Sequence, residues 1–260
     1  MNDSLPTRVD QISVMVLPDR ENMGKLAAER AIAILRNVLH EKGEARMIVA
    51  SAPSQDEVIR HLVEADLDWS KITIFHMDEY IGLAADHPAT FRAYQRDHLL
   101  SRVEPAIFHG IAGENSSPEE EAERYEALLA EGPIDLCCMG VGENGHIAFN
   151  DPSVADFQDE RLVKPVELEL ACRQQQVSDG CFPDLASVPT HALTLTIPAL
   201  CSARHLVCVV PGLRKAQAIR NMLLEPVAET CPASILRKHS SASLFLDRDA
   251  ASLWMEAQGR

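Results

Sequence analysis

The chain has 260 residues, of which 46% are apolar and 24% charged, as in a globular protein large enough to bury a core. Its formal net charge of −15 repels nucleic-acid phosphates and anionic lipids, so we expect neither nucleic acid nor a membrane as a partner. No apolar run approaches the roughly 18 residues of a membrane span, and segment 1–11 lacks the apolar core of a signal peptide.

Short apolar runs alternate with longer amphipathic segments along the chain. Because strands alternate with helices and several strands are near-continuous apolar runs, we predict an α/β fold with an open, mainly parallel, doubly wound sheet of the Rossmann-like kind. It would form a single domain of residues 1–260. The expected strands are 12–17, 46–50, 72–76, 134–139, 206–210 and 243–246, and the expected helices are about 21–40, 55–64, 90–100, 118–129 and 214–223.

The segment 151–189 breaks this alternation. It is too polar for a core strand and too long for a simple connection, and loops of this length are usually functional. In parallel sheets, ligands bind outside the carboxyl ends of the strands. We therefore predict a lid, or flap, over that edge of the sheet.

The residues after the strand 46–50 are Ser51, Ala52, Pro53, Ser54 and Gln55. Free N–H groups and the positive end of the following helix make this loop a candidate phosphate site. The alternative is an ordinary helix cap formed by one of the two serines.

Asp78 and Glu79 follow the strand 72–76. Two adjacent carboxylates at a strand end are costly unless they are solvated or used. Asp78 is well placed to act as a general base. The alternative is a pair of acids at the start of a helix.

A glycine-rich segment follows the strand 134–139. The spacing of Gly140, Gly142 and Gly145 matches a dinucleotide fingerprint, but that motif requires a helix directly afterwards. Asn-Asp-Pro at 150–152 breaks any such helix, so we favour glycines that let the backbone, at Gly142 and Gly145, approach a ligand. His146 lies in the same segment and is a candidate acid–base group, although a lone histidine is more often structural.

Lys215 follows the strand 206–210, in the first turn of a helix. A cation there opposes the helix dipole, which suggests a nearby anion; the alternative is a solvated surface lysine. The seven cysteines form no CxxC pair, and the adjacent Cys137 and Cys138 point to opposite faces of a strand. We therefore expect reduced, buried thiols in a cytoplasmic protein, and no metal site.

Together these segments resemble the glucosamine-6-phosphate deaminase/isomerase family, which shares its fold with the 6-phosphogluconolactonases. The order and spacing fit over essentially the whole chain. The lactonase branch typically reads GHTASLF where this chain has GHIAFN, which favours the deaminase branch. The matching segments are FHMDEYIGL (75–83), GVGENGHIAFNDP (140–152), HALTLTIPAL (191–200) and VVPGLRKAQAI (209–219).

The resemblance implies conversion of glucosamine 6-phosphate into fructose 6-phosphate and ammonium, without a metal or organic cofactor. It implies that Asp78 moves a proton between C2 and C1 of the open-chain sugar and that His146 opens the pyranose ring. Lys215 and the loop 51–55 would bind the phosphate.

Three positions depart from the family pattern. Asn144 stands where many members have aspartate, and Asp151 stands where they have glutamate. The relay of acid, histidine and acid thus becomes Asn144, His146 and Asp151. Asn144 can orient a ring N–H through its carbonyl but adds no charge, and Asp151 is one methylene shorter. The family's phosphate-binding arginine falls near Ser178, which makes Arg173 a candidate replacement.

Two other functions stay open at this stage. One is a 6-phosphogluconolactonase, or an isomerase of another amino-sugar phosphate such as the galactosamine epimer. The other is a sugar-phosphate sensor without catalysis. The sequence leaves the oligomeric state open, including a homo-oligomer.

Overall fold

The computed structural model of the chain describes residues 6–259. Residues 1–5 of the opening segment and residue 260 of the predicted domain lie outside the described residues. None of the helices between residues 6 and 259 is long and apolar enough to cross a membrane.

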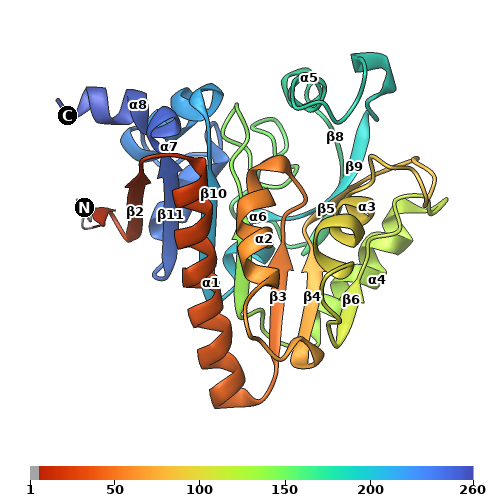
Figure 1. Cartoon of the computed structure of the whole chain (residues 1–260). Coiled ribbons are helices and arrows are strands. Elements are labelled where there is room, and N and C mark those ends of the chain that lie inside the picture. Colours follow the sequence, from red (N-terminus) through yellow and green to blue (C-terminus); the bar gives the residue numbers. More distant parts are fainter. Residues whose placement is uncertain (1–5, 260) are drawn as a thin grey trace.

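An eight-stranded sheet forms the centre of the molecule (Figure 1), with the order β1-β2-β11-β10-β7-β3-β4-β6. All neighbouring strands are parallel except β1 and β2, so the predicted mainly parallel sheet is confirmed. The strands are β1 (Thr7–Val9), β2 (Ile12–Leu17), β3 (Ala45–Val49), β4 (Ile72–His76), β6 (Ile107–His109), β7 (Leu136–Met139), β10 (His205–Val210) and β11 (Ala242–Asp247).

Helices cover both faces of this sheet. One face packs against α1 (Arg20–Lys42), α2 (Asp56–Val63) and the π-helical segment η3 (Arg96–Leu100). The other face packs against α4 (Pro118–Ala130), α6 (Ile197–Cys201), α7 (Ala216–Leu224) and α8 (Arg248–Ala257). Cys137 contributes to one core and Cys138 to the other, because successive strand side chains alternate between faces. The doubly wound arrangement is therefore confirmed.

Local sequence signals fix where the longer helices begin and end. Asp19 precedes α1 and accepts a hydrogen bond from the backbone N of Asn22, while Gly43 ends that helix in the left-handed conformation. The predicted helix 90–100 is divided between α3 (Phe91–Gln95) and η3. Thr90 begins α3 by accepting a hydrogen bond from the backbone N of Ala93.

A second, antiparallel sheet of β5 (Asp78–Tyr80), β9 (His191–Leu195) and β8 (Val163–Glu167) lies beside the first. The segment 151–189 contains β8, α5 (Leu170–Ser178) and η4 (Leu185–Ser187), three elements that the sequence analysis did not predict. Val163 and Val166 of β8 are buried while Glu167 is exposed, which is an edge-strand pattern. Figure 1 shows α5 beyond the carboxyl ends of β3 and β4.

Candidate active site

Loops from four adjacent strands meet at one cavity of about 300 Å³. The strands β10, β7, β3 and β4 are neighbours in the sheet, and because they are parallel their carboxyl ends share one edge. Asp78, His146 and Lys215 all line this cavity. The three distant segments that the sequence analysis singled out therefore converge at a single site.

The loop after β3 supplies one wall of the cavity. Ser51, Ala52 and Ser54 line it, and the Ser51 hydroxyl accepts a hydrogen bond of 2.8 Å from Nε2 of Gln95. Gln55 does not line the cavity; its fully buried side chain donates to the carbonyl oxygen of Met139 at 3.2 Å.

Neither serine of this loop caps the next helix. A 3₁₀ turn, η1 (Pro53–Gln55), precedes α2, and neither η1 nor α2 has a side-chain cap at its start. The alternative interpretation, an ordinary cap by Ser51 or Ser54, is therefore wrong. Both serines line the cavity instead, and the hydroxyl of Ser54 accepts a hydrogen bond of 3.2 Å from Nε2 of Gln55.

Asp78 lies in β5 with 7% of its surface exposed. Burial, with a further contribution from the neighbouring Glu79 charge, raises the pKa of Asp78 well above its ordinary value. A carboxyl group with a raised pKa is a stronger base and is closer to its protonation midpoint at neutral pH.

Glu79 points away from the cavity and anchors α3. Its buried carboxylate accepts hydrogen bonds from the backbone N of Tyr80 at 3.0 Å, Phe91 at 2.9 Å and Arg92 at 3.0 Å. Burial raises the pKa of Glu79 to about 6, against the lowering effect of these N–H groups. The alternative interpretation, a pair of acids at the start of a helix, is wrong because both residues lie in strand β5. Glu79 binds the first turn of α3 from a separate segment, whereas Asp78 lines the cavity.

The glycine-rich segment forms a tight turn that presents His146. The backbone N of Gly142 donates to the His146 carbonyl at 2.9 Å, and Gly145 adopts a φ of 87°. Gly142 lines the cavity, whereas Gly145 packs beside Cys231. No helix is present between residues 140 and 155, which removes the dinucleotide alternative.

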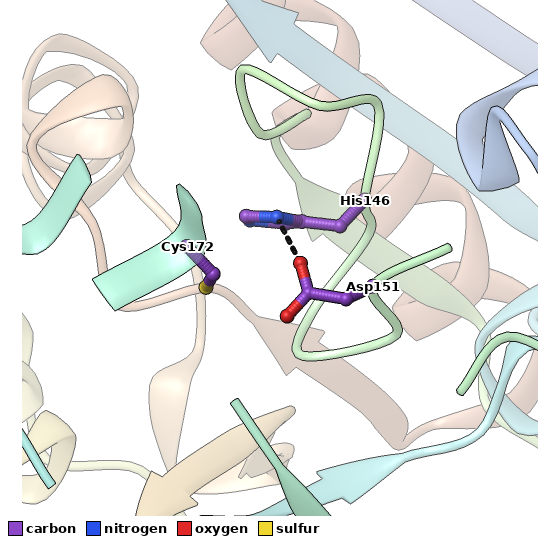
Figure 2. Close-up of side chains that lie close together, drawn as sticks. All are labelled: His146, Asp151 and Cys172. Atoms are coloured by element: carbon purple, nitrogen blue, oxygen red, sulfur yellow. Dashed lines mark ion pairs between the residues drawn. The ribbon is translucent and has the colours of Figure 1, made fainter. Parts of the chain in front are cut away.

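Behind His146 lies a network of hydrogen bonds centred on Asp151. Nδ1 of His146 is 3.0 Å from Oδ1 of the fully buried Asp151 (Figure 2), so the shorter side chain does reach the imidazole. Asn144 donates from Nδ2 to the same oxygen at 2.8 Å, and its Oδ1 accepts from the backbone N of His146 at 3.1 Å. The expectation that the Asn144 carbonyl orients the ring is therefore wrong. His146 lines the cavity, but Asn144 and Asp151 do not.

The charge of Asp151 is stabilised within this network. Burial acts to raise the pKa of Asp151, but the hydrogen bonds and charge of His146, the Asn144 amide and the backbone N of Glu169 together lower it. A charged Asp151 beside Nδ1 of His146 orients the imidazole and fixes which ring nitrogen carries the proton.

Cys172 of α5 completes a buried cluster with His146 and Asp151, and their potential ligand atoms lie within 4.8 Å of one another. Histidine, cysteine and aspartate are zinc ligands. Burial, however, raises the pKa of the Cys172 thiol and opposes the thiolate that a metal needs. The Asp151 carboxylate also already accepts hydrogen bonds from protein donors. The donor set therefore fits a hydrogen-bonded relay better than a resident metal.

Three cationic side chains line the same cavity. Lys215 ends the 3₁₀ turn η5 (Leu213–Lys215) just before α7, and burial lowers its pKa. Arg214 pairs with the carboxylate of Asp179, which follows α5. Arg20, at the start of α1, donates from Nε to Glu57 at 2.6 Å. Arg20 was not predicted from the sequence, although, like Lys215, it is a cation close to the start of a helix.

The structure does not bring Arg173 to the cavity. Its guanidinium donates to the carbonyl oxygens of Leu185 and Val188, both at 2.8 Å, and so holds the lid segment together. From the lid, Gln175, Gln176 and Asp179 line the cavity instead.

Known proteins with similar sequences and structures share one family. A family model described as glucosamine-6-phosphate isomerases/6-phosphogluconolactonase matches residues 18–245. A glucosamine-6-phosphate deaminase of Exiguobacterium sibiricum is 36% identical over 187 residues, which is 72% of each chain. A Listeria innocua protein of the same name is 34% identical over 231 residues, 88% of this chain and 96% of its own.

Solved structures give the same result. A monomeric glucosamine-6-phosphate deaminase superposes with a TM-score of 0.85 and 31% identity, covering 92% of this chain and 99% of its own. A 6-phosphogluconolactonase from Shewanella baltica superposes with a TM-score of 0.76, covering 93% of this chain and 100% of its own. At 19% identity, the second likeness concerns the fold alone.

Proposed function

The chain belongs to the glucosamine-6-phosphate isomerase/6-phosphogluconolactonase family, and we propose that it is a glucosamine-6-phosphate deaminase. The observation that carries the proposal is the meeting of Asp78, His146 and Lys215 in one cavity. Relatives at 31–36% identity carry the deaminase name, whereas the lactonase structures share the fold at lower identity. Substrate and water would yield fructose 6-phosphate and ammonia.

The phosphate end of the sugar is assigned to the wall formed by Ser51, Ala52, Ser54 and Lys215. Hydroxyl and backbone N–H groups of a loop, together with an ammonium group, form a typical phosphate site. Burial lowers the pKa of Lys215, and a bound phosphate dianion would favour its charged form. Two other cations on the cavity wall, Arg20 and Arg214, can bind the phosphate in place of the family's arginine, which this chain lacks.

The reacting carbons are assigned to the other end of the cavity. His146 would carry the proton of the C1 hydroxyl to the ring oxygen, which breaks the bond between C1 and that oxygen and opens the pyranose. The contact of its Nδ1 with Asp151 at 3.0 Å holds the imidazole for this step. Asp78 would then take the proton from C2 while the C1 carbonyl oxygen takes a proton from water, which gives an enolamine. The same carboxyl returns the proton to C1. Water adds to the resulting C2 iminium, and ammonia leaves.

The segment 151–189 would act as a lid for this reaction within a single domain. It contributes Gln175, Gln176 and Asp179 to the cavity wall, so its position controls access. A phosphorylated substrate and unpaired cysteines are consistent with a cytoplasmic enzyme. The monomeric relative indicates that a deaminase of this family does not need to form a homo-oligomer.

An ammonia-release assay on glucosamine 6-phosphate, galactosamine 6-phosphate and 6-phosphogluconolactone tests the proposal. We expect ammonia from the first substrate. Hydrolysis of the lactone without ammonia from either hexosamine would instead identify a lactonase. Tight binding of hexosamine phosphates without turnover would identify a sensor.

The Asp78→Asn variant tests the assigned base. The amide cannot accept the C2 proton, so we expect proton exchange at C2 with solvent to stop while the variant still binds glucosamine 6-phosphate. Exchange is followed by NMR in deuterated water and binding by calorimetry. Full turnover by this variant would refute the role of Asp78.

A further inference from the structure

The lid helix α5 begins directly on the hydrogen-bond network behind His146. Glu169 precedes α5, and its Oε2 lies 3.4 Å from Nδ2 of Asn144. Asn144 stands where the family resemblance implies an acid. We propose that Glu169 supplies, from the lid, the negative charge that the relay lacks at Asn144. This inference rests on the proposed deaminase function.

Contacts run in both directions between the start of α5 and the relay segment. The backbone N of Glu169 donates to Oδ2 of Asp151 at 3.3 Å, and Oε1 of Glu169 accepts from the backbone N of Ser153 at 2.9 Å. The N-terminus of α5 thus faces the Asp151 carboxylate, where the helix dipole stabilises negative charge. The lid and the relay are therefore one bonded unit.

Cys172, in the first turn of α5, lies beside the contact between His146 and Asp151 (Figure 2). It is 1% exposed, and its Sγ lies within 4.8 Å of a ligand atom of each of these two residues. With the thiol in place, water is kept from the carboxylate. Charges in such a water-poor site interact more strongly than at the surface.

The Asn144 amide lets two carboxylates lie close together. Its Nδ2 donates to both Asp151 and Glu169, at 2.8 and 3.4 Å, which offsets their repulsion. An aspartate at position 144 would instead crowd three carboxylates around one point. The negative charge beside Asp151 can therefore come from an acid at position 144 or from an acid at position 169, but not from both. In this chain it comes from Glu169.

Glu169 does not line the cavity, so it is a positioning residue that acts on His146 through Asn144 and Asp151. The first test removes the charge of Glu169 and keeps the shape of its side chain. We expect Glu169→Gln to lower kcat for ammonia release about tenfold, the scale of one lost charge-assisted hydrogen bond, while KM stays within about twofold. Glu167→Gln is the matched control, because Glu167 is an exposed acid of the same lid; it should leave both constants unchanged.

The second test is a double-mutant cycle between positions 144 and 169. Asn144→Asp alone should lower kcat, because it places three carboxylates together. In the Glu169→Gln background the same Asn144→Asp change should raise kcat, because one acid has then replaced the other. A merely structural role of Glu169 would not reverse the sign.

The outcomes separate this inference from the proposed function. An unmodified protein that releases no ammonia from any hexosamine phosphate would overturn the function itself. An active protein in which Glu169→Gln matches Glu167→Gln would overturn only the role of Glu169. Asn144→Asp lowering kcat equally in both backgrounds would do the same, and thermal unfolding of each variant verifies that it is folded.

Discussion

The backbone of Gly142 lies directly against the imidazole of His146. A Cβ atom at position 142 would come within 2.2 Å of Cε1 and Nε2 of that ring and 2.4 Å of Nδ1. Real Cβ contacts essentially never fall below 3.0 Å. In a Gly142→Ala variant the ring or the loop must therefore move by at least about 0.8 Å, the difference between these two distances.

Such a displacement should affect turnover far more than binding. The His146 ring is buried and held by Asp151 at 3.0 Å, so moving it breaks that contact. A misplacement of about 1 Å can reduce a rate about 100-fold, and overpacking costs about 1–3 kcal/mol of stability. We expect kcat to fall about 100-fold while KM changes only a few-fold, because the loop 51–54 is untouched.

Steady-state ammonia release, combined with urea denaturation, measures both effects. Gly132→Ala is the control, since a Cβ there would meet only the side chain of Arg46, at 3.0 Å from Nη1 and 3.7 Å from Cδ, and Arg46 does not line the cavity. This control should keep the original kcat. An unchanged kcat in Gly142→Ala would show that the position of the His146 ring does not limit the reaction.

Two further variants remove carboxylates, one at the cavity wall and one that anchors α3. Asp179→Asn removes the carboxylate that pairs with Arg214. Because that carboxylate competes with the substrate phosphate for Arg214, KM for glucosamine 6-phosphate should fall several-fold in the variant. A raised KM would contradict this competition. Glu79→Gln leaves the backbone N of Arg92 without a carboxylate acceptor and should cost about 1–3 kcal/mol in urea denaturation. Because folding raises the pKa of Glu79 from 4.5 to about 6, its protonation stabilises the fold fully below pH 4.5 and no longer above pH 6. The Glu79→Gln variant should lack this pH dependence of the free energy of unfolding. If the dependence persists in the variant, a titratable group other than Glu79 causes it.

The central fold could be predicted because most residues of its strands are apolar. Residues 12–17 and 72–76 match β2 and β4 in full, since burial on both faces demands such runs. β5 was missed because Asp-Glu-Tyr is too polar to suggest a strand. β5 can be buried because N–H groups of α3 bind the carboxylate of Glu79. This contact joins two separate segments, so the local sequence does not predict it.

The candidate site was predictable where a reactive side chain lies in the segment that follows a predicted strand. Asp78, His146 and Lys215 meet that condition and line the cavity. Arg20 also follows a strand, β2, but it reaches the cavity because α1 lies against α2, where Nε of Arg20 donates to Glu57. Glu169 touches the relay from a lid whose helix has a weak sequence signal, because most of its residues are polar.

The central position of β7 has a consequence for how the protein gains activity. β7 lies between β3, about 90 residues earlier, and β10, about 70 residues later. Neither half of the chain can assemble the pocket alone, and pairings over such distances are slow to form. After dilution from urea, ammonia release should therefore recover at the rate at which β7 pairs with β3 and β10. Two fragments produced by a cut in the connection before β7 should regain activity only when they are mixed.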